Sequence, residues 1–260
     1  MDKQIELSKQ QKSEDKFLIA NVLDKIKLSN NKNKIETTNF FDLREQAIIE
    51  EVLGKRKQKN YKLYGGYNSA ERRILIAFSD NINIDYNDFL SIIRINLPNN
   101  LKGGYEHKNY LGGLMKLGIK REKVGDIIVR NDGADIIIKR DIAKYIMENI
   151  VCLTRFEKSK IEQKNIEDII YVEPKKEIIK INVPSMRLDC IVGELAKCSR
   201  GDSIKYLNEE RVFVNFKEEL RPSKNVEEGD YITIRGKGRF KIDKILGTTK
   251  SGRLSIQIEK

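Results

Sequence analysis

The spacing of apolar residues changes along this chain, and its first stretch has helical spacing. Residues 17–26 (FLIANVLDKI) gather their apolar side chains on one face of a helix. A second helix is predicted to start at Asp42-Leu-Arg-Glu45, which has the spacing of a capping box, and to stop at Gly54. We therefore expect residues 1–64 to form a helical amino-terminal region.

The next stretch, residues 65–165, mixes strand-like with helix-like spacing. RILIAF and SIIRINL favour strands, and the Asp132-Gly133 pair between two apolar runs favours a hairpin. Helical spacing returns in HKNYLGGLMKLG and in DIAKYIMENI. Two helices against an antiparallel sheet predict a small α+β middle domain.

Residues 166–183 are predicted to be a connector, and residues 184–260 a third unit. Leu188 and Ile191 begin an apolar stripe at helical spacing, and Ser199 suits the cap of a following helix. The alternation in RVFVN and in YITIR then predicts a small sheet. The whole chain is therefore expected to belong to the α+β class.

The charge of the chain favours a polyanionic partner. Lysine and arginine number 50 against 39 acidic residues, so the formal net charge is +11. Such a field attracts phosphate groups at long range. The alternative is that the charge serves solubility alone in a lysine-rich proteome.

Few sequence features suggest a cofactor or a metal. Cys152, Cys190 and Cys198 form no CxxC pair, so we expect reduced thiols and no disulfide framework or zinc site. The single histidine, His107, cannot build a metal site, and neither a P-loop nor a dinucleotide fingerprint is present. The polar start and the absence of a long apolar run predict a cytoplasmic protein. No cofactor is expected.

Five motifs in the third unit follow one another in an order that resembles the S4-like RNA-binding domain (the alpha-L motif). They cover about 50 residues, which makes the resemblance specific. In chain order they are Arg187-Leu188-Asp189, Ser199-Arg200, Arg211-Val212-Phe213-Val214-Asn215, Pro222-Ser223 and Gly229-Asp230-Tyr231-Ile232. One departure is Glu210, which stands where many such domains have a glycine at the end of the second helix.

The carboxyl end and two upstream segments are similar to YlmH-type proteins, which are bacterial S4-like proteins of about this length. The ending GDYITIRGKGRFKI carries this resemblance, as does Phe216 directly after the Val-Asn pair. It extends to GGYNSAERR (residues 65–73) and to residues 107–127. The sequence at the start of that last segment departs from the family, since Glu106 replaces a threonine and weakens the expected helix cap.

The resemblance implies contacts between structured RNA and a set of cationic or polar side chains. In the S4-like unit these are Arg187, Ser199, Arg200, Lys205, Arg211 and Lys217. The RGKGRF segment adds Arg235, Lys237 and Arg239, because its glycines allow the backbone to approach a polyanion closely. Lys120 and Arg121, in a basic turn between glycines, are the candidates in the middle domain. Asp189 is interpreted as a partner that orients the cations.

What the family implies is a non-enzymatic protein on the large ribosomal subunit. Its expected partners are ribosomal RNA and peptidyl-tRNA, in the quality control of stalled complexes, and it is expected to be a monomer. One alternative is an RNA-modifying enzyme of the pseudouridine synthase type, because S4-like domains accompany such enzymes and an Arg-Leu-Asp triplet occurs in their active sites. The other is a regulator that binds nucleic acid, including DNA, through its basic face.

Overall fold

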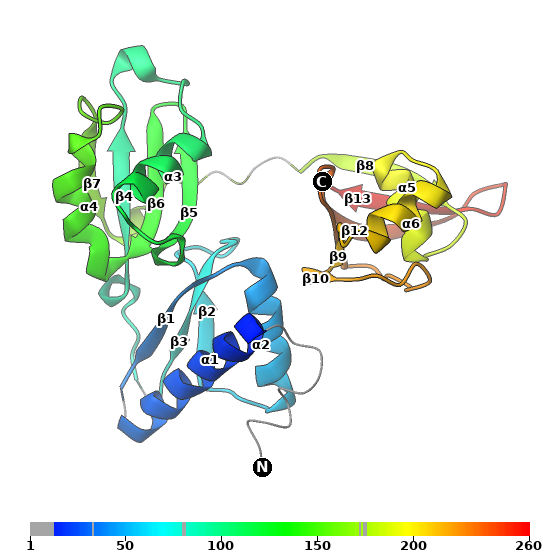
Figure 1. Cartoon of the computed structure of the whole chain (residues 1–260), viewed down its shortest axis with the longest axis horizontal. Coiled ribbons are helices and arrows are strands. Elements are labelled where there is room, and N and C mark those ends of the chain that lie inside the picture. Colours follow the sequence, from blue (N-terminus) through cyan, green and yellow to red (C-terminus); the bar gives the residue numbers. More distant parts are fainter. Residues whose placement is uncertain (1–12, 33, 80–81, 172, 174–175) are drawn as a thin grey trace. The chain divides into compact units, whose positions relative to one another are not determined.

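The computed structural model describes residues 13–32, 34–79, 82–171, 173 and 176–260. The chain divides into two compact units, Met1–Val172 and Glu173–Lys260 (Figure 1). Within the described residues, no helix is both long and apolar enough to cross a bilayer.

The first unit contains two substructures, called layers here, each of which packs two helices on one antiparallel sheet. In the first layer the sheet has three strands. The helices are α1 (Ser13–Lys32) and α2 (Leu43–Lys55), and the strands are β1 (Glu36–Phe41), β2 (Tyr61–Tyr64) and β3 (Arg73–Ala77), in the order β1-β3-β2. The expectation of a helical region over residues 1–64 is therefore wrong in part. The ETTNFF segment of β1 is rich in β-branched and aromatic residues, which fit a pleated and half-buried surface.

The ends of α2 are set by local contacts. The capping box is confirmed: the Asp42 carboxylate accepts the Glu45 N–H, and the Glu45 carboxylate accepts the Asp42 N–H. The predicted stop at Gly54 is wrong, since the helix runs through Lys55. The left-handed turn that follows is made by Lys57, with φ of 52°.

A second layer within the same unit places two helices on a four-stranded antiparallel sheet, as the sequence predicted. The strands are β4 (Leu90–Asn96), β5 (Val124–Arg130), β6 (Gly133–Lys139) and β7 (Lys160–Lys164), in the order β5-β6-β4-β7. The helices are α3 (His107–Lys116) and α4 (Ala143–Asn149), which share a core with one face of the sheet.

The hairpin between β5 and β6 is confirmed, with its turn one residue earlier than predicted. The turn residues are Asn131 and Asp132, and Gly133 is the first residue of β6, with φ of 153°. A β-carbon on Gly133 would lie 1.8 Å from the Ile95 carbonyl oxygen. Only glycine allows this close approach of two backbones.

The two layers share a hydrophobic contact, which makes them one unit. Ile74 and Ile76 on β3 and Phe40 on β1 pack against Ile92 and Ile137 of the four-stranded sheet. Successive side chains of a strand point to opposite faces, so the neighbours of these residues face α1 and α2 instead. A boundary near residue 64 would separate β2 from β3, which are paired strands.

The second unit is a six-stranded antiparallel sheet covered on one face by α5 (Leu188–Ala196) and α6 (Arg200–Asn208). Figure 1 shows these helices side by side against the sheet. In the order β10-β9-β11-β12-β13-β8, the strands are β10 (Lys217–Glu218), β9 (Val212–Val214), β11 (Tyr231–Ile234), β12 (Gly238–Thr248), β13 (Leu254–Glu259) and β8 (Ile178–Val183). Residues 178–183, predicted to be connector, are therefore strand β8, paired with β13.

Short 3-10 turns complete the described chain. They are η1 (Tyr86–Asp88), η2 (Asn99–Leu101), η3 (Arg121–Lys123), η4 (Arg140–Ile142), η5 (Ile150–Cys152) and η6 (Ile166–Asp168).

Candidate nucleic-acid interface

The second unit, which the sequence predicted to be S4-like, has at its centre a buried aspartate that binds two arginines. The side chain of Asp189 is fully buried in the first turn of α5. Arg187 donates to both of its carboxylate oxygens at 3.0 and 2.9 Å, and Arg200 donates from the start of α6 at 3.1 Å. The hydrogen bonds from Arg187, and then those from Arg200, lower the pKa of Asp189. This confirms neither arginine as an RNA contact, but it fixes both guanidinium groups at neighbouring positions.

These arginines remain accessible although their partner is not. The side chain of Arg200 is 69% exposed and that of Arg187 is 36% exposed, against 0% for Asp189. A guanidinium carries five N–H donors in a planar fork, so two bonds to a carboxylate leave others for a phosphate. The pair can therefore present oriented positive charge to solvent.

The start of α6 adds polar groups beside Arg200. Ser199 caps the helix, because its Oγ accepts the Asp202 N–H at 3.1 Å. The same hydroxyl donates to the Asp202 carboxylate at 2.7 Å, and Lys205 donates to that carboxylate at 3.1 Å. Lys205 is 72% exposed. The backbone N–H groups and the positive end of the helix dipole favour an anion at this position.

The left-handed turn after helix α6 lies at Glu210, the residue that departs from the family, although it was expected at a nearby residue such as Asn208 or the helix was expected to end differently. Glu210, which stands at the usual glycine position, itself adopts the left-handed conformation, with φ of 55°. The N–H of Glu210 donates to the Leu207 carbonyl and that of Arg211 to the Tyr206 carbonyl, so the end of the helix is satisfied.

A second group of predicted contacts lies on and around the β11–β12 turn. Arg211 lies over the Tyr206 ring at 4.3 Å and donates to the Arg235 carbonyl at 3.1 Å. Arg235, Lys237 and Arg239 are all exposed, and the turn is made possible by two glycines with positive φ. Lys217 is half-buried on β10.

Lys237 is electrostatically linked to the turn between α5 and α6. Burial raises the pKa of Cys198, with Asp202 adding to the effect, while the ammonium group of Lys237 opposes it. Cys198 directly precedes Ser199, so Lys237 brings a further positive charge toward the start of α6.

The two candidates in the middle domain have different surroundings. Lys120 is exposed. Arg121 turns inward and donates to the backbone carbonyls of Val124 and Gly125 at 2.6 and 3.1 Å, and burial lowers its pKa to about 10. Of the two, Lys120 has the geometry of a solvent-facing contact, and Arg121 that of a residue that holds the start of β5.

The two upstream segments that resemble YlmH-type proteins, residues 65–73 and 107–127, are hydrogen-bonded to each other and connect the two layers of the first unit. Asp126 accepts hydrogen bonds from the Tyr67 hydroxyl at 2.9 Å and from the N–H groups of Glu71 and Arg72 at 2.8 and 3.0 Å. Arg72 in turn donates to the carbonyls of Val124 and Phe40. The arrangement gives these residues of the resemblance a structural role.

Histidine 107 lies close to the same region. It is the first residue of α3, and burial followed by the charge of Arg121 lowers its pKa. Across the described residues, no cluster of histidine, cysteine, aspartate or glutamate side chains could hold a metal ion.

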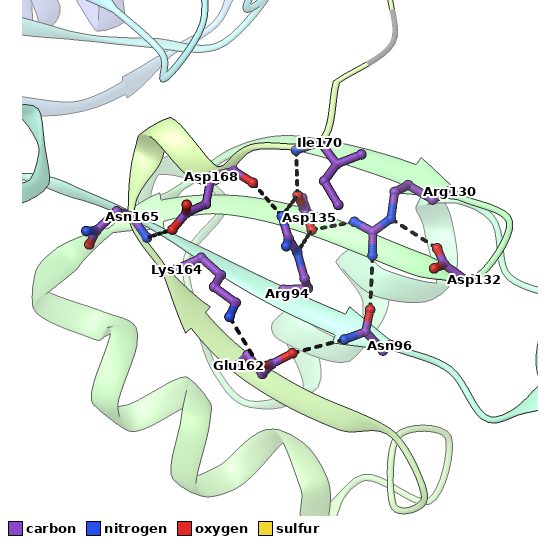
Figure 2. Close-up of polar contacts among 10 residues, drawn as sticks. All are labelled: Arg94, Asn96, Arg130, Asp132, Asp135, Glu162, Lys164, Asn165, Asp168 and Ile170. Atoms are coloured by element: carbon purple, nitrogen blue, oxygen red, sulfur yellow. Dashed lines mark hydrogen bonds and ion pairs between the residues drawn. The ribbon is translucent and has the colours of Figure 1, made fainter.

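A charged network in the middle domain was not anticipated from the sequence (Figure 2). Asp135 on β6 is fully buried and accepts from Arg94 on β4 at 2.9 and 2.8 Å, from Arg130 on β5, and from the Ile170 N–H at 3.0 Å. Hydrogen bonds from Arg94 are the largest favourable cause of the lowered pKa of Asp135, against the opposing effect of burial.

The network was visible in the sequence only as two interruptions of apolar runs. Arg94 interrupts SIIRINL and Asp135 interrupts GADIIIK. Because their strands pair with Arg94 opposite Asp135, the charges meet across the sheet. Only the strand register could have brought these two signals together.

Three comparisons relate this chain to known proteins. Residues 85–168 match the family model described as "Putative RNA-binding domain in YlmH". The chain is 29% identical over 250 residues to the Ribosome-associated protein quality control protein P2 of Bacillus subtilis (strain 168), covering 96% of each protein. The structure described as Cell division protein ylmH from Streptococcus pneumoniae is similar in fold, with a TM-score of 0.51 and 18% identity. That match covers 63% of this chain and 99% of the other.

The matched range of 85–168 spans η1 to η6, including the whole four-stranded sheet and both arginines that bind Asp135. The match to the quality control protein extends over both units. The resemblance of this chain to the YlmH-type proteins is thereby confirmed.

Proposed function

We propose that this protein binds structured RNA on the large ribosomal subunit and acts in ribosome-associated quality control of stalled peptidyl-tRNA complexes. The observation that carries the proposal is the pair of accessible guanidinium groups held on one buried carboxylate, Asp189. The name of the Bacillus subtilis relative and the family match over residues 85–168 support the same role.

Binding is favoured over catalysis by the surroundings of Asp189. A catalytic carboxylate must reach the atom on which it acts. Both oxygens of Asp189 accept bonds from arginines, the Cys190 N–H donates to one of them, and the side chain has no exposed surface. The Arg-Leu-Asp triplet is thus used here to orient cations, which argues against the synthase alternative.

The decisive experiment removes cations without touching the core. The variant Arg200→Ala/Lys205→Ala loses two exposed charges at the start of α6, and a control of equal charge, Lys244→Ala/Lys250→Ala, loses two exposed lysines elsewhere in the unit. Co-sedimentation with large ribosomal subunits at physiological salt should fall sharply for the first variant and little for the control. The melting temperature of the first variant should fall only modestly, because Arg187 still donates to both oxygens of the buried Asp189 after Arg200 is removed. The control should melt close to the wild type, because exposed substitutions change stability by only about 0.5 kcal/mol.

The outcome also locates the anchor. If the Arg200→Ala/Lys205→Ala variant sediments fully with large subunits, the S4-like unit is not the anchor and the proposal is wrong in that respect. A salt titration gives an independent check, since the logarithm of the affinity should fall by roughly 0.7 to 0.9 per phosphate contact for each unit of log salt. A slope near zero would contradict RNA binding itself.

A further inference from the structure

A phenylalanine occupies a backbone position that disfavours it. Asn215 and Phe216 form the two-residue turn between β9 and β10, with φ of 49° and 65°. Tight turns of this kind favour Asn-Gly, because a side chain at positive φ meets its own backbone. Asn215 fits the pattern and Phe216 does not. A strained position that is kept in a fold points to a use for the side chain.

The turn is held firmly from the side of Asn215. Its N–H donates to the Tyr231 carbonyl at 2.8 Å, its Oδ1 accepts the Tyr231 N–H at 3.0 Å, and its Nδ2 donates to Asp230 at 2.7 Å. These bonds fix the backbone whatever side chain follows. The ring of Phe216 is therefore not needed to form the turn.

The ring of Phe216 joins a set of aromatic side chains outside the core. It is stacked on Tyr231, with ring centroids 5.3 Å apart, and the Arg239 guanidinium lies 5.4 Å from its centre. Both rings are half-exposed, and neither belongs to the buried core of this unit. Nearby, Arg235, which follows β11, lies 4.9 Å from the centre of the half-exposed ring of Phe213 on β9.

The strand register places these side chains on one face of the sheet. Thr233 lies opposite Phe213 on β9 and opposite Arg239 on β12, while Tyr231 lies opposite Lys241. The alternate residues of these strands are buried in the core beneath α5 and α6. The face with the rings is therefore the one that the helices do not cover.

We propose that Phe213, Phe216 and Tyr231, with Arg235 and Arg239, form a stacking surface for unpaired RNA bases. Every base has a π-face that stacks on an aromatic ring or on a guanidinium plane. The cations around the rings complement the phosphates on either side of a stacked base, which favours a nucleic acid over a neutral apolar partner. The inference rests on the proposed RNA binding and assigns single-stranded segments to this face and structured RNA to the helices.

The test uses the fact that the chain contains no tryptophan. In the full-length Phe216→Trp variant, the only indole reports on this surface, and its fluorescence should be quenched by a short oligoadenylate. An RNA duplex of equal length should quench it much less. The Phe216→Gly variant relieves the turn, so its melting temperature should be unchanged or higher. Its affinity for the oligoadenylate should nevertheless fall about 5- to 150-fold, the range found for loss of one stacking ring.

Each result leads to a different conclusion. Equal affinities of wild type and Phe216→Gly for oligoadenylate, or a Phe216→Trp emission that RNA does not change, would overturn the stacking surface. The proposed function would survive if the same proteins still bind large subunits. If the wild-type protein does not bind large subunits at all, the proposed function is wrong. If Phe216→Gly fails to fold, the quenching of Phe216→Trp still decides.

Discussion

An aspartate held by two arginines occurs in both units of this protein. Asp135 and Asp189 each have no exposed side-chain surface, and each accepts hydrogen bonds from two guanidinium groups. The arginines differ: Arg94 and Arg130 are 14% and 13% exposed, whereas Arg200 is 69% exposed. The same chemistry can therefore tie a sheet together or present charge to solvent, and the exposure of the cations decides which.

The difference also follows from where each group lies. The first set spans three neighbouring strands: Arg94 on β4 lies directly opposite Asp135, and Arg130 reaches it from β5, where it lies opposite Gly133. The second joins the residue before α5 to the first residue of α6, on the outside of a helix pair. Long cationic side chains beside a packing face are thus explained by one carboxylate placed beneath them.

The largest expected effect comes from breaking the buried set. Asp135→Asn leaves two nearly buried guanidinium groups facing a neutral amide, so the free energy of unfolding at neutral pH should fall by about 3–5 kcal/mol. Denaturant unfolding measures this. Glu162→Gln, at the edge of the same network and 27% exposed, is the control and should change stability far less, because water screens its ion pairs. Similar losses for both variants would contradict the importance of burial.

Lowering the pH should reduce the difference in unfolding free energy between wild type and Asp135→Asn. The pKa of Asp135 is lowered in the folded protein, so its stabilising contribution is present above the pKa of the unfolded chain and is lost as pH falls through the folded pKa. The gap in unfolding free energy between wild type and Asp135→Asn should therefore shrink on acidification. A gap that is independent of pH would mean that the carboxylate charge is not what stabilises the sheet.

Lys139 adds a third case to the comparison of Asp135 with Asp189, because it is a buried charge whose hydrogen-bond partners are neutral. Lys139, only 8% exposed, donates to the Thr37 hydroxyl and the Thr38 carbonyl, and burial lowers its pKa to about 8. The unfolded chain then holds the proton more tightly, so stability should rise with pH between about 8 and 10.5, by up to about 3 kcal/mol. Lys139→Met should lack this part of the slope. Identical slopes in both proteins would refute the shift.

Asp189→Asn tests the exposed set and should cost less stability than Asp135→Asn. Arg187 and Arg200 can turn toward water when their partner is neutral, so a loss of about 1–3 kcal/mol is expected. Binding to large subunits should weaken more than stability suggests, because the guanidinium groups lose their fixed orientation. A nucleotide modification absent only from cells with this variant would instead support the enzymatic alternative.

The smallest effect is expected at the basic turn of the middle domain. Lys120→Ala should change stability by less than about 0.5 kcal/mol, since the side chain is exposed. If Lys120 contacts a phosphate, the salt slope of RNA binding should drop by roughly 0.7 to 0.9 relative to Lys102→Ala, another exposed lysine. Equal slopes for the two variants would exclude Lys120 from the interface.

Local patterns predicted the second unit better than the first. The stripe of Leu188 and Ile191, the Ser199 cap and the alternation of RVFVN all correspond to observed elements. Each of these signals depends on residues a few positions apart. Their ordered combination was specific enough to indicate the family.

Two strands of the amino-terminal sheet, β1 and β2, were missed, and β3 was predicted as a strand but assigned to the middle domain, because the signals that join them are weak or lie far apart. β1 is a short ETTNFF segment between two clear helices, and its partner β3 lies more than thirty residues later. The pairing of Arg94 with Asp135 was hidden for the same reason, since it depends on the register of β4 and β6. Which cations face solvent also depends on packing, as the inward turn of Arg121 shows.

The pairing of β8 with β13 has a consequence for how the second unit is made. These two strands come from opposite ends of the unit's sequence, yet Ile178 lies opposite Glu259 and Val183 opposite Leu254. During synthesis β8 emerges first and has no partner in the sheet until β13 has followed it. Contacts so distant in sequence close late and slow folding. We therefore expect this unit to complete its sheet only after β13 has left the ribosome, while the helix pair can form earlier.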